Sequence, residues 1–484
     1  MENDVNITST SIVNSFWWKF LERFFSQGIN LVVQIVLARI LLPEEFGSLA
    51  IIAAITNYAA IFVQTGLGTA LIQKKNLDKL DVSTLLSASL VVALFFYIIL
   101  FLCAPFIANV YNAPSLVWPL RVLSLTLFLN AINSIQTAIL SRKMKFKQLF
   151  IRSTFAIPIA GAAGIAMAYM GFGIWALVAH SILNILVSVI FMSFGADFKY
   201  DFHFSWPRAK ALYSFSIKIL LTSLVSGLHD TVRTMAIGKR YATSQLAYYD
   251  KGYSYSYYVT NIVSSVLSGV LLPTFSRSQD DIGKLKAMAC KSCRLTAFVM
   301  FPVLFSVIAM AKPLILLLLT EKWAACIPFL MIFCILRLPG CLMVIDKQVY
   351  YAMGNSSINF KYEIALFAAN VSVLFIMLSK GIMAIAIGAT LVEMLGAFVL
   401  MLVSRKFYNY TLRERFSDLI YPFINSIVTA GVLSLLTLVI KDNLLLLCLQ
   451  LIAGIAIYLL LSFIDNRSNL NVIIGIGRNF FKRK

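Results

Sequence analysis

The stretch "SIVNSFWWKFLERFFSQGINLVVQIVLARILLPEEFG" (Ser11–Gly47) decides how the rest of the chain is interpreted. It is longer than the about 20 mostly apolar residues that a membrane-spanning helix needs. At 100° per residue, five of its polar side chains fall within an arc of about 80°: Lys19, Arg23, Gln27, Asn30 and Gln34. Such a stripe must face protein or a water-filled cavity, and ionisable side chains there are candidates for function. The alternative is a polar seam that only holds helices together.

The composition of the whole chain is that of a membrane protein. Its 484 residues are 60% hydrophobic and 13% charged, whereas soluble domains have about 45–50% apolar and about 25% charged residues. Apolar runs long enough to span a membrane recur from end to end. The first ten residues are polar, and the apolar segment after them lacks a short core and a cleavage site, so we expect the first helix to be retained. The predicted fold class is an all-α integral membrane protein.

We predict about fourteen transmembrane helices. The ambiguous region 288–353 is interpreted as two spans, 288–319 and 323–350, in preference to three shorter segments at 288–309, 312–338 and 340–353. The other spans are expected near 14–38, 46–66, 82–108, 116–140, 150–170, 172–194, 211–236, 245–272, 360–379, 382–403, 418–440 and 444–464.

The positive charge lies in short loops rather than in a basic domain. The net charge is +20, but no segment could track a phosphate backbone, so we expect no nucleic-acid partner. With a cytoplasmic N-terminus, the cytoplasmic connections and tail hold about 26 Lys and Arg residues against about six on the other side, which is a strong positive-inside bias. This predicts that both termini are cytoplasmic. The remaining positive charge could attract an anionic substrate.

The polar stripe of the first span recurs in the seventh span. At a constant offset of 199 residues, the matching positions are Lys218, Thr222, Ser226, His229 and Arg233. The recurrence suggests two six-helix halves in the same orientation, with the substrate bound between them. The predicted domains are an N-terminal six-helix bundle (1–198), a C-terminal six-helix bundle (199–409), and two extra helices with a basic cytoplasmic tail (410–484).

Several motifs resemble those of polysaccharide biosynthesis flippases, the Wzx-type and teichuronic-acid-type exporters of the MOP superfamily. This superfamily also contains the MATE drug exporters and the lipid II flippase. The resemblance covers nearly the whole chain, and "LLPTFSRSQDD" after a Tyr-rich helix is its most specific part. The motifs are "LARILLPEEFG" (Leu37–Gly47), "IGKRYATSQLAYYDKGYSY" (Ile237–Tyr255), "LLPTFSRSQDD" (Leu271–Asp281), "AKPLILLLLTEKW" (Ala311–Trp323) and "YAMGN" (Tyr351–Asn355).

The resemblance implies a fold, a substrate and a location. The fold would be two six-helix bundles in a V shape with two helices appended. The cargo would be an undecaprenyl-pyrophosphate-linked oligosaccharide, moved from the cytoplasmic to the outer leaflet by alternating access for lipopolysaccharide or capsule synthesis. The location would be the bacterial cytoplasmic (inner) membrane. Implied partners are this lipid-linked cargo, membrane lipids and polysaccharide synthesis proteins.

A pyrophosphate would be attracted to cations in a low-dielectric cavity. Arginine suits this role because its planar fork can chelate phosphate oxygens, and side-chain amides can bind sugar hydroxyls. Arg39 could equally snorkel or pair with Glu44 or Glu45. The predicted substrate-binding residues are Lys19, Arg23, Gln27, Asn30, Arg39, Lys218, His229, Arg233 and Arg337.

Three carboxylates are candidates for binding a coupling ion, either H⁺ or Na⁺: Asp230, Glu363 and Glu393. Asp230 and Arg233 are also spaced i,i+3, so a structural ion pair explains them as well. Asp346 and Lys347 are adjacent and therefore point in different directions, so we do not expect them to pair. We expect no cofactor and no metal site.

No catalytic motif is present in the sequence, so we predict that the protein is not an enzyme. It has no P-loop, which excludes direct use of ATP by that motif. A MATE-like cation-coupled exporter of small molecules remains as an alternative, although the cationic stripes oppose it. A membrane polysaccharide polymerase is a further alternative, and the short outer loops oppose that.

Overall fold

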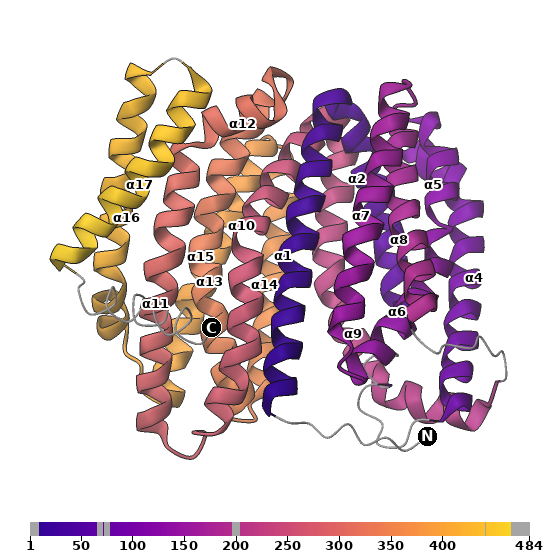
Figure 1. Cartoon of the computed structure of the whole chain (residues 1–484), viewed down its shortest axis with the longest axis horizontal. Coiled ribbons are helices and arrows are strands. Elements are labelled where there is room, and N and C mark those ends of the chain that lie inside the picture. Colours follow the sequence, from indigo (N-terminus) through magenta and orange to yellow (C-terminus); the bar gives the residue numbers. More distant parts are fainter. Residues whose placement is uncertain (1–8, 65–70, 72–77, 196–203, 441, 466–484) are drawn as a thin grey trace. The chain divides into compact units, whose positions relative to one another are not determined.

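The computed structural model describes residues 9–64, 71, 78–195, 204–440 and 442–465. These residues form helices and connections with no β-strand among them (Figure 1). Within this described part of the chain, eleven helical segments are long and apolar enough to cross a membrane, or twelve when the bent α10 (Thr243–Ser276) is counted as one span. The chain is therefore an all-α, multi-pass membrane protein, as the sequence predicts.

The chain divides into two compact units, residues 1–247 and 248–484. The first unit contains α1 (Ser9–Ile40), α2 (Pro43–Gln64), α4 (Lys79–Val110), η1 (Pro114–Leu116), α5 (Val117–Leu123), α6 (Thr126–Arg142), α7 (Phe146–Tyr169), α8 (Ile174–Gly195), α9 (Trp206–Arg240) and the first turn of α10. The second contains the rest of α10, then α11 (Ile282–Ala309), α12 (Ala311–Leu319), η2 (Glu321–Cys326), α13 (Ile327–Ala352), α14 (Ser356–Met377), α15 (Ile382–Tyr408), α16 (Leu412–Val439) and α17 (Asn443–Asp465).

The helices lie close to the predicted spans, including the ambiguous region. There, α11 and α12 together occupy 282–319, and α13 runs uninterrupted to Ala352. The region thus holds two spans, as preferred, and the break between 338 and 340 in the three-segment alternative is absent; the first span, however, ends at Ala309 instead of 319, and α12 is a separate short helix. Pro339 does not end α13, because neighbouring helices in a membrane protein can satisfy a freed backbone group.

The predicted number of fourteen spans depends on α1 and α9. These helices have 32 and 35 residues, which is long enough to cross a membrane, but they are not among the segments counted, because the count covers only the described residues and parts of both helices lie outside them. They are also the helices that carry the two predicted polar stripes. Fourteen crossings therefore stay a prediction.

The bounds of these two helices agree with an internal repeat. The first stripe helix ends at Ile40 and the next helix begins at Pro43. The second stripe helix ends at Arg240 and its successor begins at Thr243, both 200 residues further along, which is one residue more than the offset between the two stripes. The predicted domain boundaries at 198/199 and 409/410 stay predictions; the two compact units meet between Ala247 and Tyr248.

Within the first unit, α9 is fixed at both ends. Near its start, Arg208 Nη1 lies 3.0 Å from Asp78 Oδ2 and 3.2 Å from Asp81 Oδ1, at the beginning of α4. Near its end, the Tyr111 hydroxyl donates to the Met235 carbonyl at 3.3 Å. Because α4 begins beside the start of α9 and ends beside its end, the two helices run parallel.

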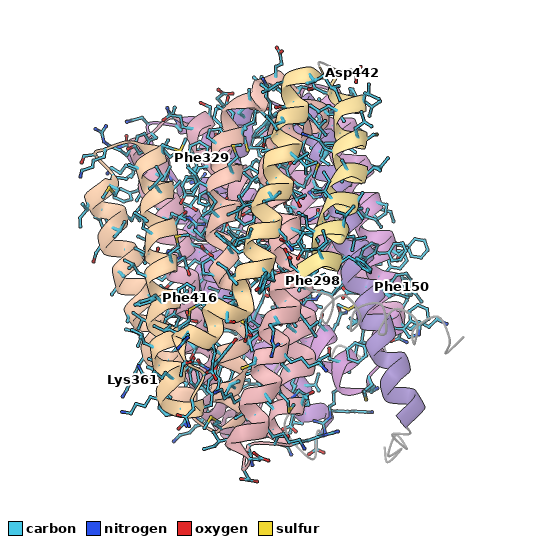
Figure 2. The ribbon with its side chains drawn as sticks, turned by 90° about the vertical axis from the view of Figure 1, so that its left-hand side faces the viewer. Phe150, Phe298, Phe329, Lys361, Phe416 and Asp442 are labelled. Carbon is cyan, nitrogen blue, oxygen red and sulfur yellow. The ribbon has the colours of Figure 1, made fainter. Side chains whose placement is uncertain are left out.

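Within the second unit, α17 is hydrogen-bonded to the helices beside it. The Tyr458 hydroxyl donates to the Phe298 carbonyl of α11 at 2.8 Å, and Gln450 Nε2 donates to the Leu433 carbonyl of α16 at 2.8 Å. Apolar side chains cover the outward faces of α16 and α17 (Figure 2). These faces suit contact with lipid.

Candidate functional site

Arg337 lies midway along the 32-residue apolar span Glu321–Ala352 of the second unit. Its guanidinium carbon is 4.5 Å from the ring centre of Tyr253 and 5.3 Å from that of Tyr257. The two tyrosines are one turn apart on α10, so they present their rings on one face of that helix. They hold the guanidinium by cation–π attraction, which is strongest where water is excluded.

The hydrogen-bonding capacity of Arg337 is largely unused. Its Nε and Nη2 atoms are buried and have no hydrogen-bond partner among the described residues. A guanidinium has five N–H donors and no acceptor, and an unsatisfied charged group in a membrane interior is costly. The unused donors therefore suit a binding site for an anion that carries oxygen atoms.

Close contact between α10 and α13 creates this arrangement. A Cβ added at Gly252 would lie 2.7 Å from Phe329 Cβ and 2.8 Å from Leu330 N, so only glycine allows the two backbones to come so near. Next to this contact, the Tyr253 ring packs edge-on against Phe333, with centroids 5.3 Å apart. The site is therefore built on two packed helices rather than on a loop.

The sequence analysis missed Lys251, which is 7% exposed and lies in the same part of α10. Its Nζ is 5.9 Å from the ring centre of Tyr255 and 6.0 Å from that of Trp323. The sequence could have indicated Lys251, because it lies in a Tyr-rich motif (Ile237–Tyr255) and Trp323 is the last residue of another motif (Ala311–Trp323). What the sequence does not show is that these two motifs meet.

The predicted stripe of α1 is only partly described. The side chains of Lys19 on α1 and Lys218 on α9 lie outside the described part of the structure. Arg23 is exposed, and Gln27 Oε1 is buried with no hydrogen-bond partner among the described residues. Asn30 is half-buried, and Arg39 is exposed at the end of the helix.

On α9, the candidates Arg233, Asp230 and His229 contact one another. Arg233 Nη1 lies 3.0 Å from Asp230 Oδ1, and His229 Nδ1 lies 3.5 Å from the same oxygen. The i,i+3 pair that the spacing allows is thus present. The Arg233 side chain is 9% exposed, whereas the Asp230 side chain is 59% exposed.

The two other candidate coupling carboxylates lie in the second unit. Glu363 Oε1 accepts a hydrogen bond from Lys347 Nζ at 2.6 Å, and Glu393 is half-buried on α15. The neighbour of Lys347, Asp346, pairs instead with Arg415, so the two adjacent residues do point to different partners. Among the described residues, no group of three or more His, Cys, Asp or Glu could hold a metal ion.

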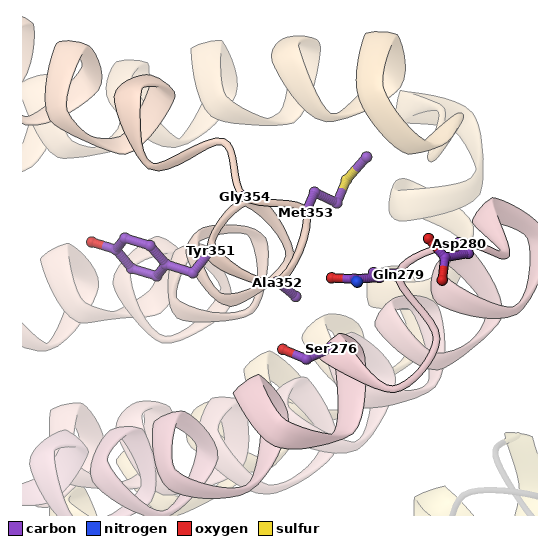
Figure 3. Close-up of a pocket in the computed structure, with 7 residues that line it drawn as sticks. All are labelled: Ser276, Gln279, Asp280, Tyr351, Ala352, Met353 and Gly354. Carbon is purple, nitrogen blue, oxygen red and sulfur yellow. The ribbon is translucent and has the colours of Figure 1, made fainter. Parts of the chain in front are cut away.

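The motifs "LLPTFSRSQDD" (Leu271–Asp281) and "YAMGN" (Tyr351–Asn355) meet at one end of the second unit. They line a cavity of about 580 Å³ between the end of α10 and the end of α13 (Figure 3). Gly354 takes φ +75°, and Asn355 N donates to the Tyr350 carbonyl at 2.9 Å, which is the glycine-dependent end of a helix. In the other motif, Asp281 accepts from Lys284 N at 2.9 Å and begins α11. Each motif thus has a structural role: one ends α13 and the other begins α11.

The family model described as "Polysaccharide biosynthesis protein" matches residues 36–328, which is more than half of the chain. The chain belongs to this family. Its curated relatives include the lipopolysaccharide biosynthesis protein WzxC of Escherichia coli K12, 24% identical over 438 residues and 88% of each chain. The succinoglycan biosynthesis transport protein ExoT of Rhizobium meliloti is 26% identical over 324 residues, which are 67% of this chain and 66% of ExoT.

Solved structures show the same fold. The lipid II flippase MurJ, in an inward closed conformation, superposes with a TM-score of 0.78 over 93% of this chain and 98% of MurJ, at 16% identity. An inward-facing MATE multidrug transporter of the MOP superfamily gives a TM-score of 0.61 over 78% of this chain and 94% of that one, at 14% identity. These likenesses show that the chain has the fold of these transporters.

Proposed function

We propose that this polysaccharide biosynthesis protein is a flippase for an undecaprenyl-pyrophosphate-linked oligosaccharide. It would move one repeat unit from the cytoplasmic to the outer leaflet of the cytoplasmic membrane by alternating access, for cell-surface polysaccharide synthesis. The names of its relatives support a role in polysaccharide export, and the MurJ-like fold supports a lipid-linked cargo.

The observation that carries the proposal is the guanidinium of Arg337. It lies midway along a membrane span, contacts two tyrosine rings on one face of α10 and has unused N–H donors. In a low-dielectric site these donors would bind phosphate oxygens strongly, and Nε with Nη2 would bind two of them at once. A cationic drug would be repelled by the same group.

The other predicted residues take supporting roles in this proposal. Arg23, Lys19 and Lys218, all in the first unit, would provide positive charge that attracts an anionic cargo, and the amides of Gln27 and Asn30 would bind sugar hydroxyls. Asp230, Glu363 or Glu393 would bind H⁺ or Na⁺ as the coupling ion. Polysaccharide synthesis proteins would deliver the cargo at the cytoplasmic face.

The test is complementation of a deletion strain with Arg337→Ala, Arg337→Gln and Arg337→Lys. We expect Ala and Gln to reduce surface polysaccharide by at least about tenfold at unchanged membrane abundance, because they remove the charge. Lys should retain part of the activity, because it keeps the charge without the fork. Arg405→Ala, at an exposed helix end, is the control. Full export by both Ala and Gln variants would contradict the proposal.

A further inference from the structure

The first unit contains a polar pocket that is separate from the Arg337 site. It has a volume of about 220 Å³ and is lined by residues of α1, α6, α7 and α8. The residues that the argument uses are Glu22, Ser26, Asn133, Arg152, Asn184 and Ser188. Seven of the nine lining residues are polar, and the other two are Ile157 and Ile185.

Three buried atoms of this lining have unused hydrogen-bonding capacity. Ser26 Oγ, Asn133 Oδ1 and Arg152 Nε have no partner among the described residues. They come from three different helices and line one pocket. Buried polar groups are normally paired, so an unpaired donor and unpaired acceptors in one hollow indicate a ligand or ordered water.

The charges of the lining balance each other. Arg152 Nη2 lies 3.7 Å from Glu22 Oε1, and both side chains are 19% exposed. The Ser153 hydroxyl donates to the same carboxylate oxygen at 3.2 Å. A cation would be repelled by Arg152 and an anion by Glu22, so the neutral pair disfavours a charged ligand.

We propose that this pocket binds the hydroxyl groups of one neutral sugar ring of the cargo. Hydroxyls are both donors and acceptors, so they satisfy Arg152 Nε and Asn133 Oδ1 together, which neither a cation nor an anion can do. The space holds several water molecules, comparable with a single sugar ring. Glu22 and Ser26 adjoin Arg23 and Gln27 on α1, so the subsite borders the predicted polar stripe.

This inference rests on the proposed function, because it takes the sugar from the glycan cargo. The other source of the same hydroxyl chemistry is water held permanently in the pocket. If the pocket binds a sugar, an added sugar should replace water at Asn133. If the water is held permanently, an added sugar should not bind there. The two sources can therefore be separated with the purified full-length protein.

The experiment is saturation-transfer NMR in detergent with free monosaccharides as probes: neutral hexoses, N-acetylhexosamines and hexuronic acids, with ribitol as an acyclic control. We expect at least one neutral sugar to receive saturation. Asn133→Leu and Ser26→Ala should weaken that binding by about tenfold, since a buried hydroxyl then lacks its partner. Asn370→Leu is the matched control, because Asn370 bonds to its own helix at Leu366 in the second unit.

No transfer to any neutral sugar, or equal transfer in wild type and Asn133→Leu, would overturn the proposal and assign the pocket to water. Thermal unfolding of each variant checks that it is folded, and Ser26→Ala supplies a second reading if Asn133→Leu is unstable. Failure here leaves the flippase proposal intact when Arg337→Ala still blocks export. Failure of the Arg337 test with sugar binding retained would contradict the flippase proposal instead.

Discussion

Arg415 of α16 and Asp346 of α13 form a doubly hydrogen-bonded ion pair in which each side chain is only 2% exposed. Arg415 Nη1 lies 2.9 Å from Asp346 Oδ2, and Nη2 lies 2.5 Å from Oδ1. The Tyr408 hydroxyl donates to Asp346 and accepts from Arg415 Nη2. The pair fixes the first of the two C-terminal helices to a central helix of the second unit.

Breaking this pair from one side should destabilise the protein strongly. Arg415→Met leaves Asp346 buried and unpaired, which costs about 3–5 kcal/mol, whereas the double variant Asp346→Leu/Arg415→Met removes both charges and should recover much of that loss. Thermal unfolding of the purified protein measures the effect. Arg413→Met, two residues away and exposed, should leave the melting temperature unchanged. Equal melting of the single variant and wild type would contradict the prediction.

The contacts of Arg337 with Tyr253 and Tyr257 should depend on the aromatic rings rather than on the hydroxyl groups. Tyr257→Phe keeps the ring and should export normally. Tyr257→Leu should lower export about threefold to thirtyfold, which corresponds to a cation–π contact of about 0.6–2 kcal/mol. Surface polysaccharide at equal protein abundance is the measurement. An equal loss in both variants would show that the hydroxyl matters instead.

Gly47 should be sensitive to a single methyl group. A Cβ at this position would lie 1.8 Å from the Thr243 carbonyl oxygen, and a backbone atom cannot move aside as a flexible side chain can. We expect Gly47→Ala to destabilise the protein by about 1–3 kcal/mol. Gly28→Ala is the control: nothing lies within 4 Å of its added Cβ, and alanine favours the helix. A lower melting temperature for Gly28→Ala than for Gly47→Ala would contradict this packing.

The sequence predicts local features well because their physics is local. Apolar length places the spans, adjacency separates Asp346 from Lys347, and i,i+3 spacing pairs Asp230 with Arg233. Arg337 is predicted as a candidate because it is a charged residue within an apolar run. Its contacts with Tyr253 and Tyr257 are not predictable, because they require α10 to pack on α13 at Gly252. The Asp346–Arg415 and Glu22–Arg152 pairs join residues far apart in the chain, and hydrophobic periodicity carries no information about such contacts.

The most direct test of the proposed function is the location of the lipid-linked glycan in a strain that lacks this protein. Spheroplasts would be treated with a membrane-impermeant sugar oxidant, and the lipid-linked fraction would be analysed by mass spectrometry. The account predicts single repeat units that accumulate protected on the cytoplasmic face and become accessible when the wild-type gene is restored. Accumulation of accessible units on the outer face would contradict it, since the block would then follow translocation.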